Sequence, residues 1–210
     1  PLVSYTSDQT TGNLTFIPLA NQFGNATITV HVTDGGLDGN LGTTNDNAST
    51  ITVFQIFVTA ENDDPTIDVL DDLTINEDAP SQTVALSGIA AGGNESQPLA
   101  ITVSSTNTNL TGPTSISYAS PDSTGTIQFT PVANLSGIAS ITVTVTDGGL
   151  DTNLATTDDN AVTTESFEVE VLAINDPPTI DPIEDASVTE DGATFSIDLT
   201  GITAGLSETQ

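Results

Sequence analysis

Apolar and polar residues alternate with a period of two in several stretches of the chain. In residues 139–146, ASITVTVT, the side chains of Ile141, Val143 and Val145 share one face, and polar residues occupy the other. Residues 25–33 alternate in the same way. Successive side chains of a strand point to opposite sides of a sheet, so this pattern predicts strands that bury one face.

Glycine, proline, asparagine and aspartate interrupt these stretches about every 8–12 residues, as short strands joined by turns require. Residues 64–176 contain seven such stretches, and no helical period of useful length accompanies them. This predicts an all-β fold, a seven-stranded Greek-key β-sandwich of immunoglobulin-like layout. The expected strands are residues 70–76, 81–87, 98–105, 115–119, 125–130, 138–146 and 164–173.

The sequence repeats itself at a fixed interval. TDGGLD begins at residue 33 and again at residue 146, and NDDPTI at residue 62 returns as NDPPTI at residue 175. The offset is the same for both motifs, since 146 − 33 equals 175 − 62. A fixed interval of this kind predicts a tandem array of one module, with the sandwiches arranged end to end.

The repeat divides the chain into three pieces. Residues 1–63 are the C-terminal part of a repeat, residues 64–176 a complete repeat, and residues 177–210 the N-terminal part of the next. The first piece lacks its opening strands, and the last contains only opening strands. We expect the chain to be a window on a longer polypeptide. The alternative is that neighbouring copies complete one another by strand addition.

The charge of the chain is one-sided. It has no Lys or Arg against 29 Asp plus Glu, which gives a formal net charge of -29. Nucleic acid and anionic membrane surfaces would be repelled, and no apolar run is long enough to insert into a membrane. Cys is absent, so disulfides and thiolate metal sites are excluded. The negative charge of the chain would therefore be balanced by a dissolved cation.

Acidic and amide residues recur at equivalent places in the repeats. In a seven-stranded sandwich the loop after the second strand, the loop after the sixth strand and the incoming link lie at the same end. Clustered carboxylates repel unless they are protonated or bind a cation, and an all-oxygen ligand set suits Ca²⁺. Ordinary solvated turns are the alternative, because Asp, Asn and Gly are common turn residues. The side chains expected to converge are Glu95, Asp147, Asp151 or Asp159, Asn62 and Asp63.

Two short motifs resemble motifs of a known family. Asn-Asp-x-Pro occurs at 62–65 and 175–178, and Asp-x-Gly occurs at 34–36 and 147–149. In these motifs the chain resembles the cadherin-like repeats found in tandem in large bacterial surface proteins and adhesins. The resemblance implies that Ca²⁺ binds between successive domains and stiffens the rod that they form.

The resemblance also implies roles for further residues. Glu77 and Glu190 lie where cadherin repeats carry an early calcium-binding glutamate, and Glu77 with Asn134 should face the next link at Asn175 and Asp176. Two acidic motifs of cadherins have no counterpart here, so fewer or weaker ions are expected at each junction. The complete set of candidate ligands is Asp34, Asp38, Asp46, Asn62, Asp63, Glu77, Glu95, Asp147, Asp151, Asp159, Asn175, Asp176, Glu190 and Glu208.

We interpret the chain as a non-enzymatic structural extender of a secreted or cell-surface repeat protein, a rod or filament made rigid by calcium. Its partners would be neighbouring repeats of the same chain and, in a filament, other copies of itself. Two alternatives stay open: an adhesive module that recognises a glycan or itself, and a subunit that polymerises by strand complementation. A nucleophilic triad is disfavoured because no Ser/Asp set recurs around the single His. A glycosidase is disfavoured because Trp is absent and aromatic residues make up only 4% of the chain.

Overall fold

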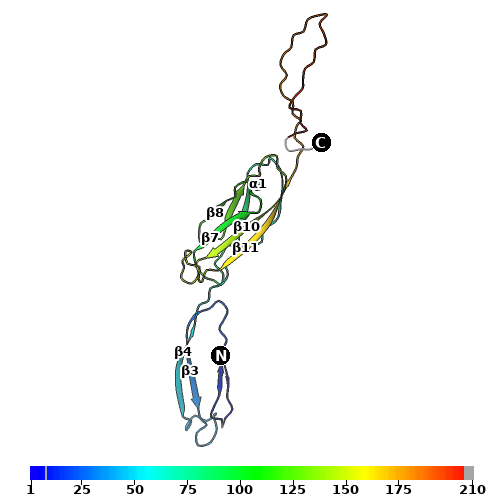
Figure 1. Cartoon of the computed structure of the whole chain (residues 1–210). Coiled ribbons are helices and arrows are strands. Elements are labelled where there is room, and N and C mark those ends of the chain that lie inside the picture. The colour runs from blue at the N-terminus through cyan, green and yellow to red at the C-terminus, as the bar shows by residue number, and fades with distance from the viewer. Residues whose placement is uncertain (8, 206–210) are drawn as a thin grey trace. The chain divides into compact units, whose positions relative to one another are not determined.

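The computed structural model describes residues 1–7 and 9–205, in which strands predominate (Figure 1). The chain forms two compact units. The first consists of Pro1–Asp63 with Gly93–Glu95, and the second of Asp64–Gly92 with Ser96–Gln210. Each unit has its own sheets.

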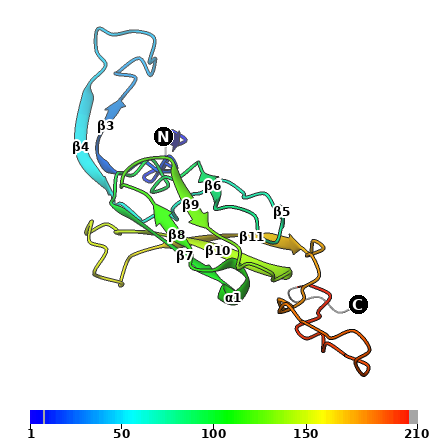
Figure 2. The same ribbon diagram turned by 90° about the horizontal axis from the view of Figure 1, so that it is seen from above.

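The second unit contains a complete two-sheet β-sandwich (Figure 2). One sheet has the order β5-β11-β10-β7 and the other the order β6-β9-β8. β5 runs parallel to β11, and the remaining pairs are antiparallel. The strands are β5 (Leu73–Asn76), β6 (Gln82–Leu86), β7 (Leu99–Ser105), β8 (Ser115–Ser117), β9 (Gly125–Phe129), β10 (Gly137–Asp147) and β11 (Val162–Leu172). This is the predicted immunoglobulin-like sandwich, and the all-β fold class is confirmed.

The core lies between these two sheets, on the strand faces that the alternating pattern predicted to be buried. Ile141, Val143 and Val145 of β10 are each 0% exposed, and Phe167 of β11 is 2% exposed. Ile141 stands opposite Phe167 in the antiparallel register of β10 and β11. The polar residues between them face outward, because a period of two alternates the faces.

One element of the second unit was not expected. A four-residue helix, α1 (Thr108–Thr111), follows β7 and buries Leu110, which is 3% exposed. A single turn is too short to show a helical period in sequence. This single turn leaves the all-β class unchanged.

The first unit is built from two strand pairs. β1 (Leu2–Ser4) pairs with β2 (Asn13–Thr15), and β3 (Gly24–Thr33) pairs with β4 (Ser49–Val58). The predicted strand at 25–33 is present as β3. Its apolar face is only partly covered, since Val32 is 57% exposed.

Candidate functional site

The acidic loop between β10 and β11 is organised by Asp147, the last residue of β10. Asp147 is 0% exposed. Its Oδ1 accepts hydrogen bonds from the backbone N–H groups of Gly149 and Ala161, both at 2.9 Å. The Asp147 N–H donates to the Ala161 carbonyl at 3.1 Å. One carboxylate oxygen thus joins the two ends of the loop, and the N–H donors stabilise its charge where water is excluded.

A second acid, Asp159, folds the middle of the loop. Its Oδ2 accepts the N–H of Leu150 at 2.8 Å and the N–H of Asp151 at 3.3 Å. Gly149 has a φ of 60°, and a Cβ at that position would lie 2.5 Å from the Asp159 Cγ. This close approach and the left-handed backbone explain why glycine occupies the position.

Asp151 closes the tip of the same loop. Its Oδ1 accepts the N–H of Asn153 at 2.9 Å, and its Oδ2 accepts the hydroxyl of Thr156 at 2.8 Å. Each of the three candidate ligands in this loop is therefore engaged by donors of the loop itself. This is the role that Asp has in ordinary turns.

The first unit repeats this network in the loop between β3 and β4. Asp34 takes the place of Asp147, Asp46 that of Asp159, and Asp38 that of Asp151. The equivalent bonds are Gly36 N–H to Asp34 Oδ1 at 3.0 Å, Ala48 N–H to Asp34 Oδ1 at 2.8 Å, Leu37 N–H to Asp46 Oδ2 at 2.7 Å, Asn40 N–H to Asp38 Oδ1 at 2.9 Å, and Thr43 hydroxyl to Asp38 Oδ2 at 2.7 Å. The same network forms in both copies, although Asp34 is exposed and Asp147 is buried. The loop sequence itself therefore determines the loop shape.

These bonds also act on the ionisation of two carboxyls in the first loop. The N–H groups of Ala48 and Gly36 lower the pKa of Asp34 below its usual value. The Thr43 hydroxyl, followed by the Asn40 N–H, lowers the pKa of Asp38. Hydrogen bonding to the charged form favours that form, so both groups are held as carboxylates.

Gly36→Ala should break the contact between Leu37 and Asp46. Gly36 has a φ of 62°, and an added Cβ would lie 2.5 Å from the Asp46 Cγ, so the carboxylate must swing away from the Leu37 N–H. We expect amide hydrogen exchange at Leu37 to accelerate by at least about tenfold, equivalent to about 1.4 kcal/mol.

Gly39→Ala is the matched control for this substitution. Gly39 has a φ of 67° in the same loop, but an added Cβ there meets no atom within 4 Å. Both variants bear the left-handed backbone cost, and only Gly36→Ala adds the clash. Equal exchange rates at Leu37 in the two variants would show that Asp46 does not hold that amide.

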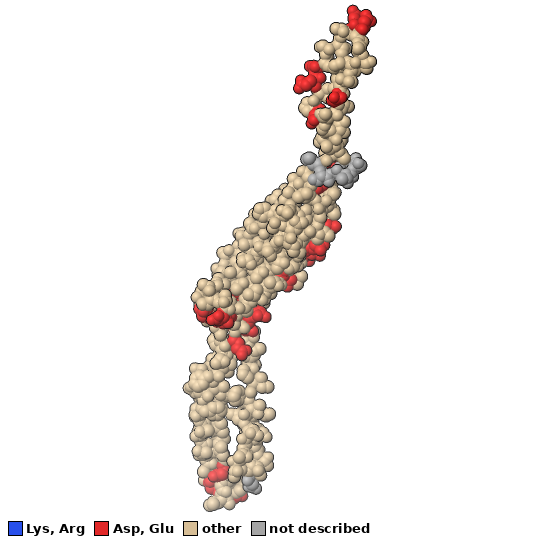
Figure 3. Space-filling view, viewed as in Figure 1, with Lys and Arg blue, Asp and Glu red and all other residues tan. Residues whose placement is uncertain are grey.

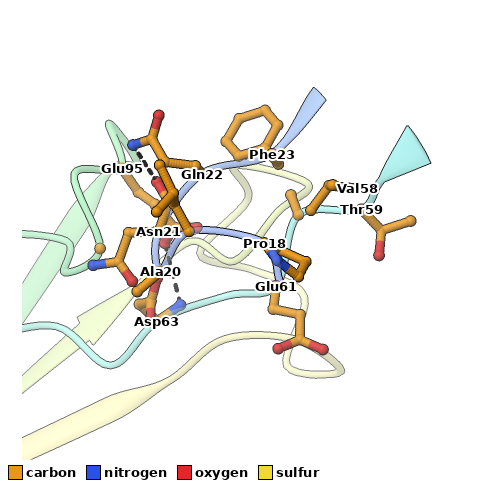
Figure 4. Close-up of a pocket in the computed structure, with 13 residues that line it drawn as sticks. Pro18, Ala20, Asn21, Gln22, Phe23, Val58, Thr59, Glu61, Asp63 and Glu95 are labelled. Atoms are coloured by element: carbon orange, nitrogen blue, oxygen red, sulfur yellow. Dashed lines mark hydrogen bonds between the residues drawn. The ribbon is translucent and has the colours of Figure 1, made fainter. Parts of the chain in front are cut away.

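The link at the end of the first unit brings two predicted ligands together. The N–H of Asp63 donates to Oε2 of Glu95 at 3.3 Å (Figure 4). A Cβ at Gly93 would overlap the Asp63 carboxylate, so the 93–95 loop packs tightly on the link. Asn62 and Asp63 are both half-buried. The predicted proximity of Glu95 to this link is therefore present in the structure.

An open groove of about 490 Å³ adjoins this pair in the first unit (Figure 4). One wall is formed by residues 18–23, the second by residues 58–61, and Asp63, Gly93 and Glu95 complete the lining. Its lining includes both apolar residues, such as Leu19 and Phe23, and polar ones, such as Asn21 and Gln22.

The second unit has its own acidic contact at the start of the next link. Glu77 is 5% exposed, its N–H donates to the Leu172 carbonyl at 2.8 Å, and its Oε1 accepts the N–H of Ile174 at 2.9 Å. The residues that follow are Asn175, whose Nδ2 donates to the Asp176 carbonyl at 3.1 Å, and Asp176 itself. The Glu77 carboxylate thus lies at the base of this link, beside Ile174.

Sequence reasoning missed Asp78 as a site residue. Its Oδ1 accepts the N–H of Asn134 at 3.0 Å, which fixes the turn before β10 against the end of β5. Asp78 has a φ of 62° and Asn134 a φ of 57°, a region that Asp and Asn tolerate better than most residues. The available signal was the repeat, since Asp191 occupies the position equivalent to Asp78 in the next copy.

The remaining candidates are not gathered into one cluster. Glu190 lies in an exposed segment, and Glu208 is outside the described residues. Among residues 1–7 and 9–205, no group of three or more His, Cys, Asp or Glu side chains is placed to hold a metal ion. A cation at these links would therefore depend on pairs of carboxylates supplemented by amide and backbone oxygens.

Asp and Glu side chains cover only part of the visible surface of the complete module. In Figure 3 they gather at one end and along one flank of it, and much of the visible face carries no charge. The described part of the chain has no helix of the length and apolar character that a membrane span needs.

The comparisons with known proteins give weak structural likenesses. No protein-family model and no curated protein matches the sequence. Among solved structures, domains 4 and 5 of the S-layer protein SbsC match at 17% identity and a TM-score of 0.38, covering 59% of this chain and 53% of that one. Titin domains z1z2 in complex with telethonin match at 16% identity and a TM-score of 0.34, covering 59% of this chain and 55% of that one.

A longer S-layer structure, SbsC domains 1-6, matches at 13% identity and a TM-score of 0.39. That match covers 87% of this chain and 21% of the other. The chain thus spans about half or less of each of these three structures. These identities and scores assign no function, and the immunoglobulin-like class follows from the strand order of the second unit.

Proposed function

We propose that this chain is a non-enzymatic structural extender of a secreted or cell-surface repeat protein. The observation that supports this best is the acidic loop that recurs at Asp34–Ala48 and Asp147–Ala161 with the same hydrogen bonds. The repeated feature is a loop shape fixed by the chain's own donors. Repetition of shape is what a spacer needs, because each module must present its ends in the same way to its neighbours.

The long strand pair of the module suits this mechanical role. β10 and β11 pair without interruption from Gly137↔Val171 to Thr146↔Val162. Asp147 continues β10 into the acidic loop at one end, and Glu77 ties β11 to the next link at the other. A force along the module would be carried by these hydrogen bonds and by the buried faces beneath them.

Calcium at the links is the second part of the proposal. Asp63 with Glu95, and Glu77 with Asn175 and Asp176, are the residues that would hold the ion, which would cancel repulsion between carboxylates. Ca²⁺ takes six to eight oxygens, and carboxylate pairs supply only part of that number. We therefore infer weak sites, with dissociation constants of about 10⁻⁴–10⁻³ M, as in other extracellular modules.

Small-angle X-ray scattering tests this part of the proposal. The radius of gyration and the flexibility of the chain should differ between millimolar calcium and excess chelator, with the more extended, less flexible state in calcium. Glu95→Gln should reduce this response, because it removes one charge of the Asp63–Glu95 pair.

Glu168→Gln is the control, since Glu168 is an exposed residue of β11 away from both links. It should respond to calcium as the unaltered chain does. Identical scattering profiles in calcium and in chelator would rule out calcium stiffening. They would not bear on the extender role, which rests on the repeated loop shape of the modules.

A further inference from the structure

The complete module has one long edge strand. Four strands end its two sheets, β5 and β7 in one sheet and β6 and β8 in the other. β5, β6 and β8 contain 4, 5 and 3 residues, whereas β7 contains 7. β7 lies beside β10, with β11 on the other side of β10 (Figure 1). An edge strand presents backbone N–H and C=O groups that can pair with another strand, and a longer edge presents more of them.

The backbone of β7 alternates between β10 and this edge. The N–H of Thr106 donates to the Ser140 carbonyl at 2.9 Å, at the position that continues the register of β7 with β10. In an antiparallel pair every second residue directs its N–H and C=O groups to the same neighbour. Ile101 and Val103 stand at the intervening positions, so they direct theirs to the edge. Leu99 does the same, and its N–H donates at 2.9 Å to a serine hydroxyl oxygen in the loop after β8.

β7 lacks the features that usually protect an edge strand. Its sequence, LAITVSS, contains no charged residue, no proline and no glycine, and its register with β10 is continuous. Charged side chains, proline and bulges are the devices by which proteins keep sheet edges from pairing. The far side of the same sheet differs, because β11 carries Glu165, Glu168 and Glu170. There the N–H of Glu168 donates to Oδ1 of Asp72 at 2.7 Å. Of these two sides, the β7 side is therefore the one that a further neutral strand can join.

The sequence of β7 is complementary to itself when two copies run antiparallel. Thr102 is the middle residue, and it can stand opposite Thr102 of a second copy. Ile101 then lies opposite Val103 on the core side of the sheet, where Ile101 is buried and Val103 half-buried. Ala100 lies opposite Ser104 on the outer side. Cross-strand pairs of β-branched residues and of threonines stabilise sheets, so each face of the joined strands carries suitable partners.

The outer face next to this edge is uncharged as well. Thr144 of β10 stands beside Thr102, and Thr142 beside Ser104. Two copies that meet at β7 would bring these hydroxyl surfaces side by side, and the glutamates of β11 would stay on the far side of each sheet. The chain has a formal net charge of -29 and no Lys or Arg, so a contact between its acidic surfaces would be repulsive. A second copy therefore fits at β7, where the strand and the face beside it carry no carboxylate.

We propose that two copies of the chain associate through β7, antiparallel and across a two-fold axis at Thr102. The two four-stranded sheets would form one continuous sheet. Ile101 and Val103 of each copy would exchange backbone hydrogen bonds with Val103 and Ile101 of the other. Such a contact uses the same surface on both copies and closes at the dimer. It goes beyond the extender function, because it joins two extenders through their complete modules, and it requires no metal ion.

Charge and size set the conditions for this association. The contact is one strand wide, which is small for a stable interface, so millimolar concentrations of chain are needed to populate the dimer fully. The net charge of each copy opposes association. Salt screens this repulsion, since the Debye length falls from about 30 Å at 0.01 M to about 8 Å at 0.15 M. Association should therefore strengthen as sodium chloride is raised, with chelator present throughout.

Sedimentation equilibrium of the 210-residue chain in chelator, from micromolar to millimolar concentration, tests the proposal. We expect a monomer–dimer equilibrium that Thr102→Asp weakens by at least about tenfold, because like charges directly opposite one another destabilise a strand pair. Thr164→Asp is the matched control. It adds the same charge to an exposed threonine in the same row of the outer face, on β11, and should leave association within about twofold. A chain that stays monomeric at millimolar concentration, or a dimer that both substitutions weaken equally, would overturn the proposal.

Disulfide trapping tests the register without adding a charge, and the chain has no cysteine of its own. Thr102→Cys should form a covalent dimer under mild oxidation. Directly opposed residues that do not exchange backbone bonds have Cα atoms about 4.5 Å apart, which a disulfide can span. Thr164→Cys, equally placed on the outer face, should stay monomeric under the same conditions. Equal dimer yields from the two variants, or a dimer in sedimentation that Thr102→Cys does not trap, would overturn strand pairing at β7. Either result would leave the extender role untouched, since that role does not depend on association.

Discussion

Ile141→Ala is expected to lower the free energy of unfolding of the complete module by about 2–5 kcal/mol. Ile141 is 0% exposed and lies in the middle of β10, opposite Phe167 on β11 and Ser105 on β7. Removing its buried carbon atoms loses their transfer free energy and leaves a cavity that three paired strands cannot close. No substitution of an outward residue in this module should have a comparable effect.

Ile138→Ala is the internal control for this prediction. Ile138 lies on the same strand but is 57% exposed, so the same substitution should cost less than about 1 kcal/mol. Urea unfolding can be followed by tyrosine fluorescence in a Tyr5→Phe background, where Tyr118 is the only tyrosine and packs against the core. Equal costs at the two positions would contradict the position of the core.

Asp147→Ala is expected to cost about 3 kcal/mol in the same unfolding measurement. Hydrogen bonds to a charged group contribute about 1.5–3 kcal/mol each, and the Gly149 and Ala161 N–H groups would both lose their acceptor. Part of that loss is offset, because a fully buried carboxylate no longer has to be desolvated.

Asp147→Asn separates the hydrogen bonds from the charge. The amide keeps an oxygen where Oδ1 lies, so both N–H donors can remain satisfied, and the cost should be less than half that of Asp147→Ala. Two variants of equal stability would show that the charge itself, and not the two N–H bonds, holds the loop. An Asp147→Ala variant as stable as the unaltered chain would contradict the anchoring role altogether.

The strands of the complete module could be predicted because their signal is local. Along most of β10 and β11 the inward positions are apolar and their neighbours are polar, so the period of two fixes which face is buried. The strand ends found in the structure differ from the expected ones by a few residues at most. The single turn of α1 could not be found this way, because one turn is too short to show a helical period.

The acidic loops were harder to interpret from sequence, for a chemical reason. Asp is both a preferred calcium ligand and a preferred acceptor for backbone N–H groups in turns. The pattern of Asp147, Asp151 and Asp159 is compatible with either use, and only the positions of the donors show that the loop uses all three internally. The contact of Glu95 with Asp63 could be expected, because sandwich topology brings that loop to the link.

The exposed faces in the first unit do not follow from the local alternation alone. The alternation in β3 correctly predicts a strand, but it does not say whether a second layer covers its apolar side. Val32 and Val145 occupy equivalent positions, and they are 57% and 0% exposed. The difference arises from strands distant in sequence, which a local pattern does not contain.

Electron spin resonance distance measurement between the two units tests the stiff extender most directly. Spin labels on Thr29→Cys in β3 and Thr164→Cys in β11 would report the spread of distances, because both positions are exposed and the chain has no other cysteine. The extender predicts a narrow distribution in millimolar calcium that broadens in chelator, and that stays broad in calcium when Glu95→Gln is added. An equally broad distribution with and without calcium would contradict a rod made stiff by calcium.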